Sequence, residues 1–177
     1  MRTETLAALA FLAAATPLGG QALVLDPSGV APQADTFALL VNGREAGRQV
    51  VSLERDPRGF LFRETTTTSA GHQTTEVWMD GGLRMLSVHQ EGEMGGQPMR
   101  IDVEYDAGRA TGTARIPGAG GVQEVEVDAA VPGAVVDDNV LMALLPALPL
   151  EPGAELELPV FSAGTNTLTA SQGWCCG

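Results

Sequence analysis

Residues 99–105 read MRIDVEY, and their side chains alternate strictly between apolar and charged. A period of two residues is typical of a β-strand that buries one face and leaves the other in water. The following residues, Asp106-Ala107-Gly108, have the composition of a tight turn. This stretch therefore predicts one strand of a half-hydrated sheet, followed by a hairpin. The side chains assigned to its inner face are Met99, Ile101, Val103 and Tyr105.

The same pattern extends outward from this strand in both directions. In residues 124–131, Val125, Val127, Ala129 and Val131 alternate with acidic residues, and Phe60 and Phe62 share one face of an earlier run. Turn signals recur at nearly regular intervals between residues 36 and 131, which predicts a β-meander, sandwich or barrel. The turns are expected at Asn42-Gly43, Asp56 to Gly59, Ser69 to Gly71, Asp80 to Gly82, Gly92 to Gln97, Asp106 to Gly108 and Pro117 to Gly121.

One segment has a helical period instead. Leu141, Leu144, Leu145 and Leu148 are spaced as one stripe of a helix, and Pro146 limits its length. The preceding Asp137-Asp138 is expected to supply the N-cap. Because this short helix has no polar face, we expect it to lie against the sheet or inside its curve. Residues 155–161 and 165–172 are predicted as two further strands.

The chain is expected to contain one domain. Residues 1–22 resemble a secretory signal, with an apolar run at 6–15 that is too short to span a bilayer and small residues before the expected cleavage site. Residues 23–35 are interpreted as a linker, 36–172 as the β domain and 173–177 as an atypical tail. We therefore predict an exported protein, periplasmic or secreted, with no membrane span after removal of the signal.

The charge of the chain excludes several classes of chemistry. The sequence has 22 acidic residues and 10 basic ones, all arginine, for a net charge of −12. A chain without lysine has no phosphate-loop lysine and no Schiff-base lysine. Nucleic-acid binding is not expected either, because phosphate contacts require clustered cations. We assign most of the acidic charge to the hydrated face of the sheet.

No catalytic residue, metal ligand or cofactor is expected. Ser87 and His89 lie two residues apart in a strand, which places them beyond direct hydrogen-bonding reach, and His72 falls at a turn. The adjacent Cys175 and Cys176 would form a strained pair. Bridging to another molecule, a redox or metal role, and a non-native tail all remain open for them, as does the oligomeric state.

Methionines on the expected inner face suggest a binding surface. Methionine is flexible and adapts to apolar ligands of variable shape. We hypothesise that the curved sheet and the helical segment enclose a lipid-like or acyl ligand; in the alternative interpretation, the same side chains fill an ordinary core. The candidate ligand-binding residues are Met79, Met85, Met99, Tyr105, Leu141, Met142 and Leu145.

Several stretches resemble a family of exported bacterial β-domains of unknown function. They are TTEVW at 74–78, Leu83-Arg84, YDAGRATGT at 105–113, Asp137 to Asn139 and LLPALPL at 144–150. The resemblance covers about residues 36–170 and extends to the half-barrels of periplasmic lipoprotein carriers. It implies a mainly β fold: a curved antiparallel meander or half-barrel with one short apolar helix. The family pattern continues as strand after Thr169, where this sequence departs from it, so residues 173–177 are expected to be a truncated or shifted ending.

A second functional hypothesis is a structural or partner-binding envelope protein. Such a protein would use an exposed sheet edge, and the last strand, expected to lack a neighbour, is the candidate.

Overall fold

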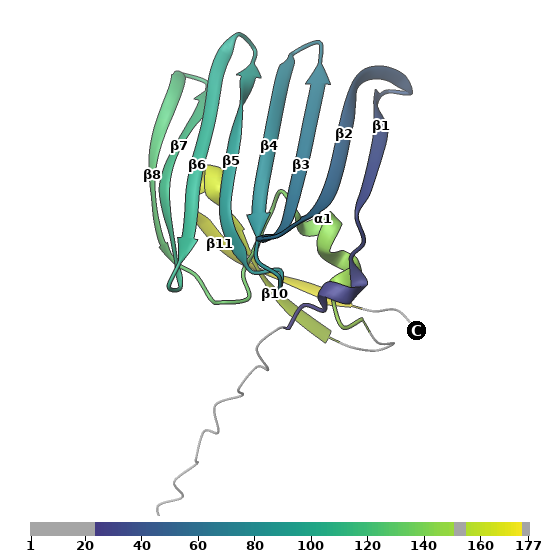
Figure 1. The fold of residues 1–177 in the computed structure, drawn as a ribbon. Coiled ribbons are helices and arrows are strands. Elements are labelled where there is room, and N and C mark those ends of the chain that lie inside the picture. Colours follow the sequence, from purple (N-terminus) through teal and green to yellow (C-terminus); the bar gives the residue numbers. More distant parts are fainter. Residues whose placement is uncertain (1–23, 151–154, 175–177) are drawn as a thin grey trace, which may run out of the picture.

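The computed structural model describes residues 24–150 and 155–174. Eight antiparallel strands follow one another in a single meander sheet whose spatial order is that of the sequence, and the sheet is not closed into a barrel (Figure 1). This confirms the predicted mainly β, curved meander. The strands are β1 (Gln33–Val41), β2 (Arg44–Asp56), β3 (Gly59–Thr68), β4 (Gly71–Met79), β5 (Met85–Met94), β6 (Gln97–Asp106), β7 (Arg109–Gly118) and β8 (Gly121–Ala130).

The predicted turns are the turns of this sheet. At the β1–β2 connection, Asn42 and Gly43 both have positive φ, 52° and 74°, which is the two-residue hairpin geometry that matches strand twist. Asp56 starts the β2–β3 turn and accepts a hydrogen bond from the backbone N–H of Arg58 at 3.0 Å. These local signals need no long-range contact, and this explains why they could be read from the sequence.

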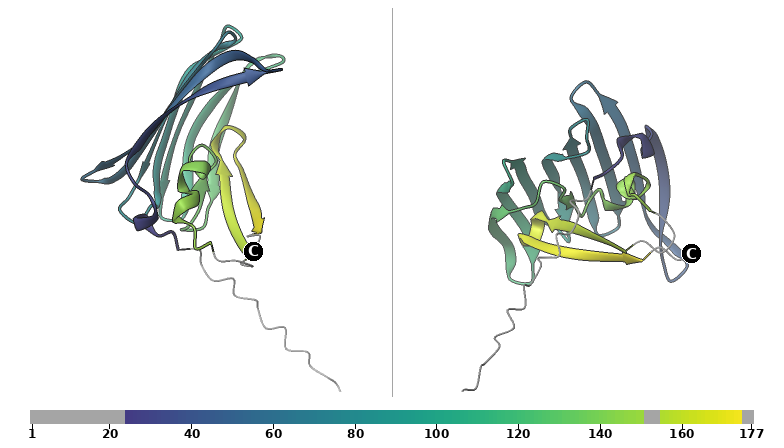
Figure 2. Two further views of the ribbon diagram at one scale, coloured as in Figure 1. Left: turned by 90° about the vertical axis from the view of Figure 1, so that its right-hand side faces the viewer. Right: turned by 90° about the horizontal axis from the view of Figure 1, so that it is seen from below.

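A second layer packs against the inner face of the large sheet. It consists of a three-stranded sheet in the order β11-β10-β9 and a short helical segment. Figures 1 and 2 show this layer against one end of the large sheet, with the strands extending beyond it at the other. Its elements are β9 (Val136–Asp137), α1 (Leu141–Leu144), η2 (Leu145–Ala147), β10 (Glu155–Ser162), η3 (Ala163–Thr165) and β11 (Thr167–Trp174).

The core lies between the two layers. One row of inner-face side chains runs straight across the sheet through Leu53, Phe62, Val77, Val88 and Val103, which are paired strand to strand and all buried. Phe161 of β10 and Leu144 of α1, from the second layer, belong to the same buried cluster. The alternate residues of β6 and β8 (Arg100, Glu104, Glu126) are exposed, as the two-residue period predicted.

The helical segment is short and is capped differently from our prediction. α1 comprises four residues, continues as the 3₁₀ turn η2 and lies inside the curve of the sheet as predicted. The expected aspartate N-cap is wrong: Val140 occupies the N-cap position, and no side chain caps the helix. Asp137 is instead fully buried, and its carboxylate accepts hydrogen bonds from Tyr105 and Asn139.

The remaining boundary predictions fall at the ends of the described chain. In the segment interpreted as a linker, η1 (Pro27–Gly29) precedes β1, and Leu25 and Val30 are buried in the core. The predicted signal at residues 1–22 and the cysteines at 175 and 176 lie outside the described residues. β11 continues to Trp174 and pairs along its length with β10, so it does not lack a neighbour on that side.

Candidate functional site

The predicted candidate residues fall in three separate places. Met79, Met85 and Tyr105 are buried in the core, while Met99 lies toward the opposite, uncovered end of the inner face. Met142 is 77% exposed on α1. Leu141 and Leu145 are half-buried beside it. The structure therefore brings Met79, Met85 and Tyr105 together but does not join all seven residues in one site.

Met85 reaches the inner face through an irregularity of the sheet. Trp78 and Ser87 are paired, yet the next pair is Met79 and Met85, so β5 has a bulge at Leu86. One extra residue changes which face the following side chain occupies. Ser87 and His89 consequently lie on the outer face, although simple alternation would place them on the same face as Met85.

A groove opens between the inner face of β1–β3 and α1. Its volume is about 600 Å³, within the range of roughly 300–1,000 Å³ that is usual for small-molecule sites. Apolar walls come from both layers, and polar side chains lie among them. The apolar lining residues are Phe37, Val51, Phe62, Met142 and Ala143, and the polar ones are Gln33, Asp35, Gln49, Glu64, Asp138 and Asn139.

Of the candidate residues, only Met142 lines this groove. Sequence reasoning missed its other walls, which come from the inner face of the first three strands. The shared face of Phe60 and Phe62 was one available signal. The alternation in β1 is weak, because polar Gln33 and Asp35 precede Phe37 on the same face.

A network of buried polar groups fixes the α1 wall of the groove. Tyr105 donates to Asp137 Oδ2 at 2.7 Å, and Asn139 donates to Asp137 Oδ1 from both its backbone N–H and its side chain, at 3.0 and 2.7 Å. Gln90 in turn donates to Asn139 Oδ1 at 3.3 Å and to Thr75 Oγ1 at 3.0 Å. These bonds connect β4, β5 and β6 with the segment that precedes α1.

Burial dominates the electrostatics of this network. Loss of water raises the pKa of Asp137 to about 6, and the neighbouring charge of Asp138 acts in the same direction, against the hydrogen bonds from Tyr105 and Asn139. The pKa of Tyr105 is also raised well above its usual value, first by burial and then by the charge of Asp137. Tyr105 therefore keeps its proton at physiological pH and remains a hydrogen-bond donor to Asp137.

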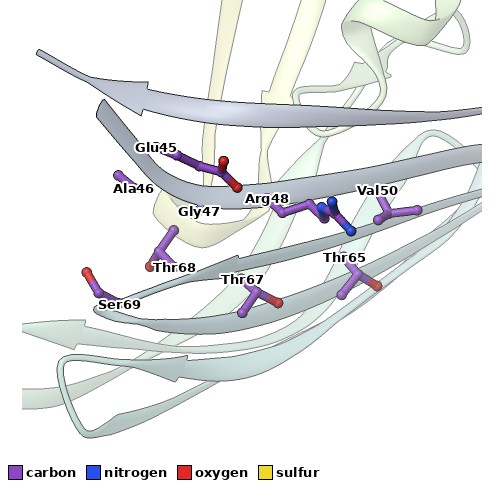
Figure 3. A pocket seen from close by; sticks show the side chains of 9 residues that line it. All are labelled: Glu45, Ala46, Gly47, Arg48, Val50, Thr65, Thr67, Thr68 and Ser69. Atoms are coloured by element: carbon purple, nitrogen blue, oxygen red, sulfur yellow. The ribbon is translucent and has the colours of Figure 1, made fainter. Parts of the chain in front are cut away.

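Two other hollows are less suited to a ligand. Figure 3 shows one of about 450 Å³ on the outer side of β2 and β3, where Arg48, Val50, Thr65 and Thr67 line it from neighbouring strands of one sheet. All of its lining residues belong to these strands and the turn after β3, so no second layer closes it. The other, of about 340 Å³, lies at the rim beside Met85 and Tyr105.

Several titratable groups of the outer face contact one another. His89 Nδ1 lies 2.6 Å from Asp102 Oδ1, and Arg100 donates to the other oxygen at 2.6 Å. Within residues 24–150 and 155–174, no hydrogen bond joins Ser87 to His89, and no group of three or more His, Cys, Asp and Glu is placed to hold a metal ion. Across the same ranges, no helix is long and apolar enough to cross a membrane.

An open, curved antiparallel sheet with a short apolar helix against its inner face defines the structural class of this protein. Residues 36–170 match the family model described as "Protein of unknown function (DUF3108)". Since the match covers more than half of the chain, the protein belongs to this family. No curated protein and no solved structure matches the chain.

Proposed function

We propose that this protein is an exported binding protein that takes a lipid-like or acyl ligand into the groove between β1–β3 and α1. The observation that carries the proposal is the groove itself, with apolar side chains on both of its walls. The proposed role is one of binding, without catalysis and without a prosthetic group.

The exposure of the groove walls supports this role. Phe37 is 50% exposed and Met142 is 77% exposed, although both are large apolar side chains. Covering apolar surface contributes about 25 cal/mol per Å², so an apolar chain placed against both residues would be bound favourably. Exposed apolar side chains that line a concave surface are typical of interaction sites.

Export and the kind of ligand are supported by the sequence. The apolar run at residues 6–15 is typical of a secretory signal. The resemblance to the half-barrels of periplasmic lipoprotein carriers favours the acyl group of a lipoprotein as one such ligand. Fractionation of cells that express the full chain tests the location: recovery of the protein from the cytoplasm with residues 1–22 still attached would contradict it.

Binding can be tested with the neutral apolar fluorophore N-phenyl-1-naphthylamine. We expect saturable fluorescence enhancement with the wild-type protein and a dissociation constant raised about fivefold or more by Phe37→Ser, which removes apolar contact from the groove. Val50→Ser is the matched control, because Val50 is 43% exposed on the outer face of the neighbouring strand. Absence of saturable binding, or an equal effect of both variants, would contradict the proposal.

A second candidate function is favoured by strand β1. It forms one edge of the large sheet, and its Leu40 and Val41 are 63% and 60% exposed. An edge with exposed apolar side chains can add a strand from a partner protein or a second copy. Sedimentation velocity tests strand addition between two copies. Concentration-dependent association that Leu40→Lys abolishes would support it. A protein that stays monomeric at all concentrations would contradict strand addition between copies.

A further inference from the structure

The polar side chains of the groove carry one sign of charge. Asp35 of β1, Glu64 of β3 and Asp138 before α1 line it, and no arginine or histidine does. Within the described part of the chain, none of these three carboxylates forms an ion pair. Glu64 accepts a hydrogen bond from Thr66, and Asp138 accepts one from Asn139, but both donors are neutral groups that bring no positive charge to the groove.

Strand register places two of these charges around an apolar position. Asp35 is paired with Val51, and Val51 with Glu64, so the three residues form one row across the inner face. Neighbouring strands lie about 4.8 Å apart, which puts the backbones of Asp35 and Glu64 about 10 Å from each other. Phe37 and Phe62 occupy the adjacent rows. Acidic and apolar groups therefore alternate within one groove.

This arrangement discriminates between ligand head groups. An anionic head group would meet two or three uncompensated carboxylates, in a protein whose net charge is −12. A cationic head group would be attracted by the same carboxylates. Apolar side chains on both walls exclude part of the water from the groove, which strengthens both effects relative to bulk water.

We infer that the groove takes an amphiphile with a positively charged head group, an alkylammonium, whose apolar chain packs against Phe37, Val51 and Met142 while the ammonium lies between Asp35 and Glu64. This inference rests on the proposed function and adds to it the chemical class of the ligand. It excludes free fatty acids as the preferred ligands.

Three amphiphiles of equal chain length test the inference: dodecyltrimethylammonium, dodecanoate and the neutral monododecanoylglycerol. Each is titrated below its micellar concentration into the wild-type protein near neutral pH and followed by isothermal calorimetry. We expect the cation to bind about tenfold or more tightly than the anion, with the neutral compound between them. The methyl resonances of labelled methionines locate the site: Met142 should shift on binding, and Met94, at the far end of β5, should not.

Charge variants separate a local effect from attraction to an acidic protein. The double variant Asp35→Asn/Glu64→Gln should reduce the preference for the cation to about threefold or less while still binding the neutral amphiphile. Glu104→Gln/Glu126→Gln removes the same number of charges from exposed positions on the outer face and should retain the preference.

The outcomes are distinguishable. Equal binding of all three amphiphiles would overturn the head-group inference and leave the groove as an apolar site. The head-group inference would also be overturned if the outer-face double variant lost the preference for the cation as fully as the groove double variant. Failure of the neutral and cationic amphiphiles to bind at all would overturn the proposed function together with the inference.

Discussion

The phenolic oxygen of Tyr105 on β6 donates a 2.7 Å hydrogen bond to Oδ2 of Asp137 on β9, and both residues are buried. This bond joins the large sheet to the layer that carries α1. Asp137 is a fully buried carboxylate, and its second oxygen positions Asn139 in the wall of the groove. The stability of the interface between the layers and the shape of the groove therefore depend on the same pair.

Replacing Tyr105 by phenylalanine should destabilise the protein by about 1–3 kcal/mol near neutral pH, because a buried charged acceptor loses a donor. It should also raise the pKa of Asp137 further, since the bond from Tyr105 lowers that pKa. Urea denaturation of Tyr105→Phe, Asp137→Asn and the double variant measures the coupling. Additive effects of the two substitutions would contradict a direct interaction.

Asp137 should make stability depend on pH. Its pKa is about 6 in the folded protein against 3.8 ordinarily, so the folded state binds more protons than the unfolded chain between these values. The contribution is fully present below pH 4 and is lost as the pH rises through 6; it amounts to about 3 kcal/mol. Denaturation of the wild type and Asp137→Asn across pH 4–7 should show this slope in the wild type alone.

Glu104→Gln is the control for this experiment. Glu104 is exposed on the outer face of β6, next to Tyr105 in sequence, and its loss should leave the slope unchanged. Exposed carboxylates whose pKa values are lowered by hydrogen bonds, such as Asp26 through Ser28, act in the opposite direction and below pH 4. A wild-type slope identical to that of Asp137→Asn would refute the assignment.

Two residues of α1, Leu144 and Met142, should differ sharply in their effect on stability. Leu144 is 1% exposed in the core, so Leu144→Ala should cost about 2–5 kcal/mol through lost burial and a residual cavity. Met142 projects from the same helix into water, and Met142→Ala should change stability by less than about 0.5 kcal/mol. Thermal and urea unfolding of both variants measures the difference. Similar losses of stability in the two variants would contradict the predicted burial of Leu144 and exposure of Met142.

Gly112 should resist substitution because of its place in the sheet. It lies between Val103 and Val127 in the buried row, and a β-carbon there would overlap the carbonyl oxygen of Asp102. Gly112→Ala should therefore cost about 1–3 kcal/mol. Gly120→Ala in the β7–β8 turn meets no neighbouring atom and should be nearly neutral. Equal stability of the two variants would contradict the predicted overlap.

The sequence alone determined the strands, their turns and most of their faces. The alternation at residues 99–105 and the Asn42-Gly43 turn act over a few residues, so they can be recognised without knowing what lies opposite. Because the apolar segment at residues 141–148 has no polar face, its sequence likewise predicted that it packs against the sheet. These local patterns were sufficient for the fold class and for the order of the eight strands.

Only the tertiary structure decided where the groove lies and what lines it. Gln90 and Asn139 meet although 49 residues separate them, and no local pattern records such a contact. Asp137 resembled a helix cap in the sequence, but burial against Tyr105 gave its carboxylate a different partner. A bulge likewise placed Ser87 and His89 on the outer face, while Met85 lies on the inner face as expected. Period and turn composition specify which way a side chain points, whereas the site depends on which distant surface covers it.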